Sequence, residues 1–206
     1  MRLNKEERRI YLLRHGSIEK PDCERRYIGQ LDLPLSADGV HEACLLEAAF
    51  RGKTISAMFC SDLIRSIATA KIICRKLTGN IFIRPDLKEI GMGEWEGKTF
   101  KEVAQTYPDE YAKRGSRIAD YRIPGAESFA ECGARVSAAF KEITAMTQGD
   151  ILIVGHAGVN RLLLTQLLGM PLENMFRLGQ DYACVNILAG ENGNYRVMLL
   201  NGKGVG

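Results

Sequence analysis

Short apolar runs recur along the chain and alternate with longer segments of helical periodicity. Runs rich in Ile, Leu, Val, Phe and Ala are typical of strands that are buried on both faces of a sheet. The sequence predicts six such strands, at residues 10–13, 57–60, 81–83, 151–154, 183–188 and 195–199. An Asn-Gly pair between the last two runs predicts a hairpin, so the final strand should run antiparallel to its neighbour.

Polar residues that favour helix caps precede several of the periodic segments. Ser36 predicts the start of a first helix, one side of which carries Val40, Cys44 and Ala48. Ser61 or Asp62 predicts the cap of a second helix over residues 63–77. A strand followed at once by a capped helix is the repeating unit of α/β proteins.

The second half of the chain carries the clearest helix signal. Ser128 and Glu131 form a capping-box sequence, after which apolar residues recur at helical spacing: Phe129, Cys132, Val136, Ala139, Ile143 and Met146. A further helix is predicted over residues 158–169, where a glycine and then a proline end the pattern.

The order of these elements predicts an α/β fold of three layers, α/β/α. Its central sheet should be mostly parallel, with the last strand antiparallel. We expect residues 1–206 to form one domain, because no linker, repeat or low-complexity segment divides them. Residues 89–124 are less regular and contain a predicted helix at 99–107. We interpret them as a helical insertion over the carboxyl ends of the strands.

Composition narrows the class of protein. The 46% of apolar and 26% of charged residues are typical of a soluble globular protein, and 206 residues can bury a substantial core. A net charge of +3 is too small to indicate a nucleic-acid partner. No apolar run is long enough to span a membrane or resembles an export signal. The six cysteines lack CxxC or metal-ligand spacing, so we expect reduced thiols and a cytoplasmic location.

Two of the three histidines lie where an apolar run stops. Ile-Tyr-Leu-Leu leads into Arg14, His15 and Gly16, and Ile-Leu-Ile-Val leads into Gly155 and His156. Carboxyl ends of parallel strands are where ligands bind in such folds. One strand-end histidine is usually a satisfied polar residue at the edge of the core. Two with the same pattern, one next to an arginine, favour a functional site.

Arginine at such a position indicates a planar anion as the ligand. The guanidinium of Arg14 matches phosphate or carboxylate, and its burial without a partner is costly. Arg65 lies in the first turn of the predicted second helix, so it starts from the same edge of the sheet. Helix N-termini also favour anions. Taken alone, Arg65 would be interpreted as a surface residue of an amphipathic helix.

The segment LKEIGMGEWEG supplies carboxylates for proton transfer. Glu89, Glu94 and Glu96 lie among three glycines, but the spacing is not that of a dinucleotide-binding loop. No Walker sequence, HExxH, GxSxG or calcium-binding loop occurs in the chain. The candidate chemistry therefore rests on two histidines, two arginines and a carboxylate, and we expect no metal and no cofactor.

Six segments in a fixed order resemble the histidine phosphatase superfamily. They are LLRHG, YIGQLDLPLSADG, SDLIRSIATA, LKEIGMGEWEG, PGAESF and VGHAGVNR, and they span residues 12 to about 161. The superfamily includes cofactor-dependent phosphoglycerate mutases, fructose bisphosphatases and α-ribazole phosphatases. The sequence looks most like the α-ribazole phosphatase group, chiefly through VGHAGVNRLLLTQLLGMPLENMFRL.

The resemblance implies a covalent mechanism without metal. His15 would attack phosphorus as a neutral imidazole and become a phosphohistidine that water hydrolyses. Arg14, Arg65 and His156 would surround the phosphoryl group, and Glu89 would be the general acid and base. Nearby arginines favour the neutral form of His15, whereas a phosphate dianion would favour protonation of His156 and Glu89. Further substrate contacts are implied at Gly16, Ser17, Gly29, Gln30 and Ala157.

The chain departs from the family pattern directly after RHG. Many members continue with an acidic residue or glutamine, a threonine and then an asparagine, whereas this chain continues with Ser17, Ile18, Glu19, Lys20 and Pro21. The hydroxyl and amide that this loop usually offers to phosphate are therefore missing or replaced by Ser17. The nucleophile, both arginines, the acid and the second histidine are all retained.

The function that this pattern predicts is a phosphomonoesterase for a small phosphorylated metabolite, with α-ribazole 5′-phosphate as a candidate substrate. One alternative is phosphoryl transfer of the phosphoglycerate mutase type. Others are a phosphate-binding regulatory domain and a phosphatase directed at phosphoproteins. Selectivity should lie in residues 20–33 and 98–124, and a homodimer is the assembly that the family suggests.

Overall fold

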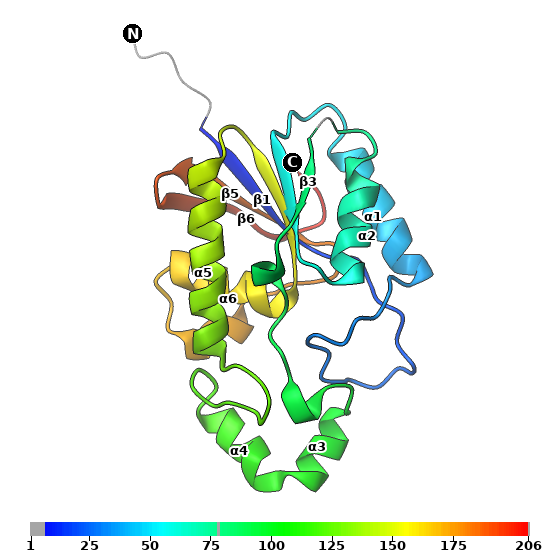
Figure 1. Cartoon of the computed structure of the whole chain (residues 1–206), viewed down its shortest axis with the longest axis vertical. Helices are drawn as coiled ribbons and strands as arrows, with labels where there is room; N and C mark the ends of the chain where they lie inside the picture. Colours follow the sequence, from blue (N-terminus) through cyan, green and yellow to red (C-terminus); the bar gives the residue numbers. More distant parts are fainter. Residues whose placement is uncertain (1–6, 78, 206) are drawn as a thin grey trace.

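The computed structural model describes residues 7–77 and 79–205, which form a six-stranded sheet between two layers of helices (Figure 1). The strand order is β3-β2-β4-β1-β5-β6. Neighbours from β3 to β1 are parallel, whereas β5 is antiparallel to both β1 and β6. The strands are β1 (Arg9–Arg14), β2 (Ala57–Cys60), β3 (Ile81–Ile83), β4 (Ile151–Gly155), β5 (Val185–Glu191) and β6 (Asn194–Gly202). All six predicted strands and the predicted fold class are confirmed.

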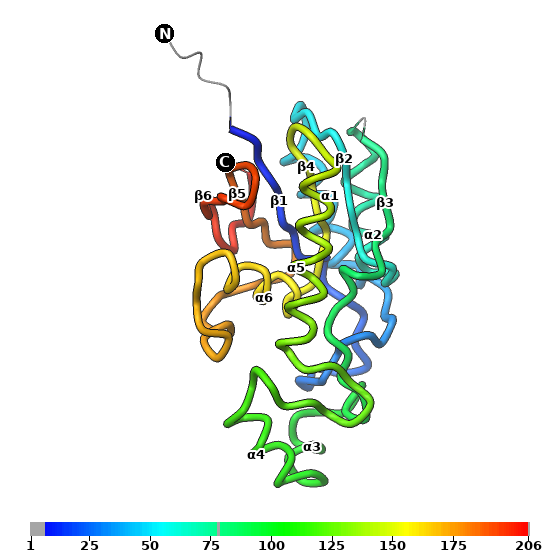
Figure 2. The backbone as a smooth tube through the Cα atoms, turned by 60° about the vertical axis from the view of Figure 1, so that its left-hand side comes forward, coloured from blue at the N-terminus to red at the C-terminus, as the bar shows by residue number. Residues whose placement is uncertain are grey.

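The central strands are buried on both faces, as their uninterrupted apolar sequences predict. In β1, Ile10 and Leu12 pack under helices α5 (Phe129–Met146) and α6 (Ala157–Leu167), whereas Tyr11 and Leu13 pack on the opposite side. That opposite side is covered by α1 (Ala37–Ala49) and α2 (Ile64–Cys74) (Figure 2). The strand period of two thus builds one core on each side of the sheet.

The caps predicted for α1 and α5 are present. The hydroxyl oxygen of Ser36 accepts from the N–H of Gly39 at 3.1 Å. Ser128 and Glu131 complete a reciprocal capping box at the start of α5. The Asn-Gly turn between β5 and β6 is also present, with positive φ at Asn192 and Gly193 as that hairpin requires.

The predicted cap of α2 is wrong. The helix begins after Leu63, and neither Ser61 nor Asp62 provides a side-chain cap. The carboxylate of Asp32, from a loop far away in the sequence, instead accepts from the N–H of Ile64 at 2.8 Å. A tertiary contact therefore satisfies the helix end that a local cap was expected to satisfy.

The apolar side expected for α1 is not the side that packs. Val40 is 43% exposed and Ala48 is also exposed, whereas α1 buries Gly39, Ala43 and Leu46. A Cβ atom on Gly39 would lie only 1.9 Å from the carbonyl oxygen of Ser17. Close approach of α1 to the loop after β1 thus selects the face with the smallest residues.

Residues 89–124 lie beyond the carboxyl ends of the parallel strands, where α3 (Phe100–Thr106) and α4 (Pro108–Ser116) form the lower end of the molecule (Figure 1). The helix predicted at 99–107 is α3, with Thr99 as its cap. Trp95 is fully buried against Tyr27 in the apolar cluster of this region. Helix α4 was not predicted, because its nine residues are mostly polar and none of them is buried.

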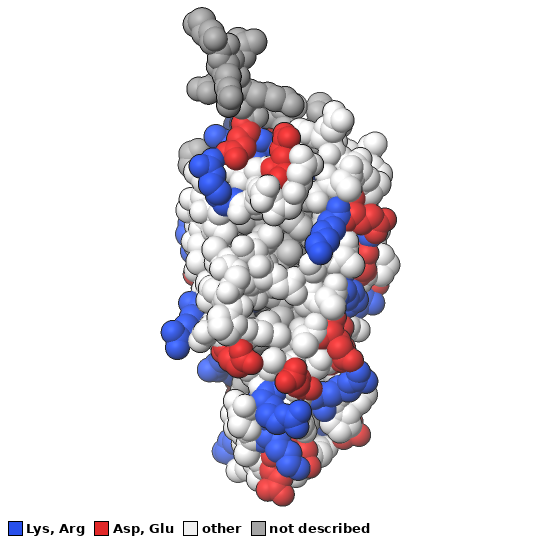
Figure 3. All heavy atoms as spheres, turned by 90° about the vertical axis from the view of Figure 1, so that its left-hand side faces the viewer, with Lys and Arg blue, Asp and Glu red and all other residues white. Residues whose placement is uncertain are grey.

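Within the described residues, three short 3-10 helices complete the fold: η1 (Pro85–Leu87), η2 (Gly93–Trp95) and η3 (Leu172–Arg177). On the face shown in Figure 3, basic and acidic side chains are interspersed and gather over the lower end of the molecule, where α3 and α4 lie. In the described ranges, no helix is long and apolar enough to cross a membrane.

Candidate active site

The register between β1 and β4 brings the two strand-end histidines together. Arg14 pairs with Gly155, so the next residues, His15 and His156, leave the sheet side by side. The N–H of His15 donates to the carbonyl of Gly155 at 3.1 Å, and the two imidazole centroids are 5.1 Å apart. The convergence expected from the repeated strand–glycine–histidine pattern is therefore present.

His15 is held in one tautomer by its own backbone. Its side chain is buried, and Nδ1 lies 2.7 Å from the carbonyl oxygen of Gly16. Because a carbonyl oxygen only accepts, we assign the proton to Nδ1, which leaves the lone pair on Nε2. Burial, and then the charges of Arg14 and Arg65, hold the pKa of His15 well below its ordinary value. The ring is thus neutral and nucleophilic at Nε2, and burial contributes more than the arginines expected to cause this.

His156 is also completely buried and is oriented by Ser61. The Ser61 hydroxyl lies 2.7 Å from Nε2 of His156, and its oxygen also accepts the N–H of Leu63. No other acceptor in the described residues reaches the hydroxyl proton, so we assign that proton to the bond with Nε2 and the ring proton to Nδ1. Within the described residues Nδ1 has no hydrogen-bond partner. Burial, followed by the charges of His15 and Arg65, lowers the pKa of His156 well below its ordinary value.

The two arginines are held alike, each by backbone carbonyls on one edge of the guanidinium. Nη1 of Arg14 donates to the carbonyl of Gln180 at 2.7 Å. Arg65 donates from Nη1 to Leu31 at 2.7 Å and from Nη2 to Gly29 at 2.6 Å. In each case Nε is buried, and no acceptor in the described part of the chain reaches it. A buried N–H without an acceptor requires an explanation, and an anion with several oxygens provides one.

Glu89 lies in the loop after β3 and η1 and contacts the start of α6. Its carboxylate accepts from the N–H groups of Gly158 at 3.0 Å and Val159 at 3.1 Å, in the first turn of α6. It also accepts from the N–H of Ile90. The residue immediately before α6 is His156, so the acid candidate and the second histidine are fixed to the same helix end.

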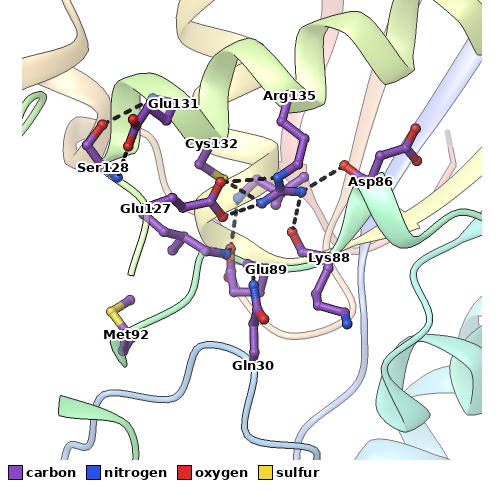
Figure 4. Close-up of polar contacts among 12 residues, drawn as sticks. Gln30, Asp86, Lys88, Glu89, Met92, Glu127, Ser128, Glu131, Cys132 and Arg135 are labelled. Carbon is purple, nitrogen blue, oxygen red and sulfur yellow. Dashed lines mark hydrogen bonds and ion pairs between the residues drawn. The ribbon is translucent and has the colours of Figure 1, made fainter. Parts of the chain in front are cut away.

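The backbone that carries Glu89 is clamped by Arg135 of α5 (Figure 4). Nη1 of Arg135 donates to the carbonyls of Asp86 and Lys88 at 2.8 and 3.0 Å, while the rest of the guanidinium pairs with Glu127. This ion pair gives Glu127, a residue of the PGAESF segment, a positioning role. Groups held in this way lose little entropy when a substrate binds.

Ser17, a predicted substrate contact, is bound to a carboxylate of α1 in this structure. Both its N–H and its hydroxyl donate to the carboxylate of Glu42, at 2.7 and 3.0 Å. Gly16 lies next to this contact, and a Cβ atom there would be 2.4 Å from the carbonyl oxygen of Gly39. The loop after His15 is therefore shaped by α1, and Ser17 contributes to that shape.

The backbone groups of Gly29 and Gln30 bind other residues of the site. Their N–H groups donate to the carboxylate of Glu96 at 3.1 and 2.7 Å, and the carbonyl of Gly29 holds Arg65. The Gln30 side chain donates to the carbonyl of Glu89 at 3.0 Å. Ala157 is the first residue of α6, directly beside His156.

Sequence reasoning missed several residues of the site. Ser61 follows a strand just as the two histidines do, so its position at the end of β2 was a usable signal. Gln180 and Tyr182 precede β5 in a stretch without a recognisable motif, and only the structure places them beside Arg14. In the part of the chain that the structure describes, no group of three or more His, Cys, Asp or Glu residues could hold a metal ion.

At the strand ends of this three-layer α/β fold, the described residues place two buried imidazoles, two arginines whose Nε atoms have no acceptor there, and one carboxylate. The chain belongs to the histidine phosphatase superfamily (branch 1), whose family description matches residues 10–203. Members of this superfamily are phosphatases and mutases, so the chain is an enzyme of phosphoric monoester chemistry.

Individual relatives agree with this assignment. The adenosylcobalamin/alpha-ribazole phosphatase of Escherichia coli is 27% identical over 96% of this chain and 98% of its own. The "Probable phosphoglycerate mutase GpmB" of Proteus mirabilis is 35% identical over 79% of this chain and 75% of its own. The solved alpha-ribazole phosphatase of Shigella flexneri has a TM-score of 0.87 at 26% identity, covering 96% of this chain and 98% of that chain.

Proposed function

We propose that this protein hydrolyses a small phosphorylated metabolite, without a metal, through a phosphohistidine on Nε2 of His15. The single observation that carries the proposal is the hydrogen bond from Nδ1 of His15 to the carbonyl of Gly16. It leaves the lone pair of a buried, neutral imidazole on Nε2, and among the described residues the nearby side chains of Arg14, Arg65 and His156 each keep a buried N–H without an acceptor. A nucleophile beside three donors is the arrangement that phosphoryl transfer needs.

In the first displacement, Nε2 of His15 bonds to phosphorus as the bond from phosphorus to the ester oxygen breaks. Nε of Arg14, Nε of Arg65 and Nδ1 of His156 donate to the non-bridging oxygens. The leaving alkoxide takes a proton from Glu89, whose carboxyl group is held at the start of α6.

In the second displacement, water attacks the phosphohistidine. Glu89 now accepts a proton from the water while the new phosphorus–oxygen bond forms and the bond to Nε2 breaks. The products are inorganic phosphate and the imidazole in its starting state. Two displacements at one aligned nitrogen need no group beyond those already present in the pocket.

The candidate substrate is α-ribazole 5′-phosphate. The relatives named for this activity align over nearly the whole chain, which supports it. The second candidate is phosphoryl transfer of the phosphoglycerate mutase type, which a relative at 35% identity favours. A binding domain without turnover is disfavoured, because His15 and Glu89 are both retained. A phosphatase directed at phosphoproteins would need a broad docking surface near the pocket.

We further propose that residues 1–206 are one domain, with residues 89–124 as an insertion, and that the protein acts in the cytoplasm. All six cysteines are free, and Cys23 is the exposed one. Free thiols suit a reducing compartment. A homodimer is proposed from family resemblance, and light scattering after size-exclusion chromatography tests it.

The proposal is tested by hydrolysis of p-nitrophenyl phosphate, followed by a panel that includes α-ribazole 5′-phosphate and phosphoglycerates. His15→Ala should lower kcat by at least about a thousandfold, and Glu89→Gln by about a hundredfold or more. His41→Ala is the matched control, because His41 is exposed on α1 and should leave kcat unchanged. Brief reaction with ³²P-labelled substrate should label wild type with an acid-labile, base-stable phosphate that His15→Ala lacks. Equal activity in wild type and His15→Ala would reject the mechanism.

A further inference from the structure

Two backbone hydrogen bonds join the turn before β5 to the end of β1, one at Arg14 and one at His15. The N–H of Ala183 donates to the carbonyl of His15, and the N–H of Arg14 donates to the carbonyl of Cys184, both at 3.1 Å. Ala183 has φ of 53°, a left-handed conformation that an alanine adopts only at a cost. This constrained turn holds Tyr182 against Arg14 and His15.

The ring of Tyr182 lies over the guanidinium of Arg14 and beside the imidazole of His15. Cζ of Arg14 is 3.7 Å from the ring centroid, and the His15 imidazole centroid is 5.7 Å from it. An arginine stacked on an aromatic face gains attraction from the ring quadrupole and loses freedom to tilt. The pKa of Arg65 is lowered, chiefly by its burial, and Tyr182 is one of several nearby groups that oppose this shift.

The segment that carries Tyr182 contacts the edge of the Arg14 guanidinium as well as its face. The carbonyl of Gln180 accepts from Nη1 of Arg14, and the buried Gln180 side chain is fixed by Asn186 and Asn160 at 2.8 to 3.1 Å. Gln180 therefore restricts rotation of the Arg14 guanidinium in its plane, and Tyr182 restricts its tilt out of that plane.

In this chain the loop after His15 does not fix the orientation of the Arg14 guanidinium, so other contacts must do so. The hydroxyl and N–H of Ser17 are both taken by Glu42, so this loop directs no Ser17 donor at the phosphate position. The two arginines and His156 then carry the phosphoryl charge, and the orientation of Arg14 matters correspondingly more.

We propose that Tyr182 is a positioning residue for phosphoryl binding, whose ring fixes the plane of the Arg14 guanidinium so that its Nε edge meets the phosphoryl oxygens. The inference rests on the proposed function for its catalytic consequence, but anion binding can be measured without turnover. The ring, and not the hydroxyl, is the part that acts.

The test measures binding of inorganic phosphate by calorimetry, together with kcat and KM for p-nitrophenyl phosphate, in the full chain. Tyr182→Leu should raise both the phosphate Kd and the KM about tenfold, because the aromatic face is lost. Tyr182→Phe should keep both within about twofold of wild type. Tyr195→Leu is the matched control, since Tyr195 is also half-buried but packs on Phe140, and both parameters should match wild type.

A second arm separates positioning from general loosening of the fold. In an Arg14→Gln background, Tyr182→Leu should change the phosphate Kd by less than about twofold, because the ring then has no guanidinium to orient. Additive losses in this background would overturn the proposal. So would an unchanged Kd in Tyr182→Leu, or a loss in Tyr182→Phe as large as that in Tyr182→Leu. Absence of any turnover by wild type would reject the proposed function, while the phosphate Kd values would still decide the role of Tyr182.

Discussion

The hydroxyl of Ser61 lies 2.7 Å from Nε2 of His156 and determines which nitrogen of that ring faces the pocket. Ser61 follows β2 and His156 follows β4, two neighbouring parallel strands. The contact therefore exists only because the sheet aligns the two strand ends. It connects the tautomer of a proposed phosphate ligand to a serine that no motif of the sequence identifies.

Replacement of Ser61 by alanine should weaken the site more than the fold. Nε2 of His156 would lose its buried donor, which costs about 1–3 kcal/mol of unfolding free energy. The ring would also be free to adopt the other tautomer, so we expect kcat to fall about tenfold or more. Ser116→Ala, in an exposed part of α4 where the hydroxyl bonds only to its own helix, is the control. Urea denaturation and steady-state kinetics measure the two effects, and an unchanged kcat in Ser61→Ala would contradict this role.

Stability should fall as the pH is lowered through 6.5. The folded-state pKa values of His15 and His156 lie well below the ordinary value of 6.5, chiefly because of burial. Below pH 6.5 the unfolded chain therefore binds more protons than the folded chain, which favours unfolding. Each histidine should cost up to about 1.4 kcal/mol per pH unit in this window.

Urea denaturation between pH 7.5 and 5 checks this dependence. In His15→Gln the unfolding free energy should fall less steeply with decreasing pH, by the contribution of one proton. One buried neutral imidazole is then absent. His41→Gln should leave the wild-type slope, since His41 is exposed. A slope unaffected by removal of His15 would show that other groups cause the pH dependence.

Most of the fold could be predicted because its signals are local. Buried strands such as 57–60 and 151–154 have uninterrupted apolar sequences, and the capping box at Ser128 contains both of its partners within four residues. The cap of α2 could not be predicted, because Asp32 reaches Ile64 only after the chain has folded. Helix α4 was missed because its nine residues are mostly polar and none of them is buried, so it lacks the apolar repeat that indicates a packed helix.

The candidate site likewise contains residues with a local sequence signal and contacts without one. His15, Arg14, Arg65, Glu89 and His156 could be identified because each lies at a strand end or in a segment that resembles the family. Their supporting contacts could not, since backbone carbonyls hold both arginines and any residue supplies a carbonyl. The turn of Ser17 toward Glu42 likewise depends on how closely α1 approaches the loop.

The clamp on the loop that carries Glu89 should affect catalysis from a distance. Arg135→Met keeps most of the side-chain volume but removes the donors to the carbonyls of Asp86 and Lys88. We expect a three- to tenfold lower kcat with KM little changed, because Glu89 would be less well positioned (about 1 kcal/mol). Arg122→Met removes an exposed ion pair with Glu131 and should match wild type. A wild-type kcat in Arg135→Met would limit this arginine to a structural role.

The sharpest geometric prediction concerns Gly158. A Cβ atom there would lie 2.6 Å from Oε1 of Glu89, so Gly158→Ala must displace the carboxylate or the start of α6. Misplacement of a reacting group by about 1 Å can cost about a hundredfold in rate. We therefore expect kcat to fall 10- to 100-fold, with phosphate still bound by the arginines at nearly its wild-type Kd. Gly115→Ala on α4 is the matched control, because a Cβ atom there meets nothing within 4 Å and alanine favours the helix. Wild-type turnover in Gly158→Ala would show that turnover does not depend on the carboxylate of Glu89 at this position. Its assignment as general acid and base would then have to be withdrawn.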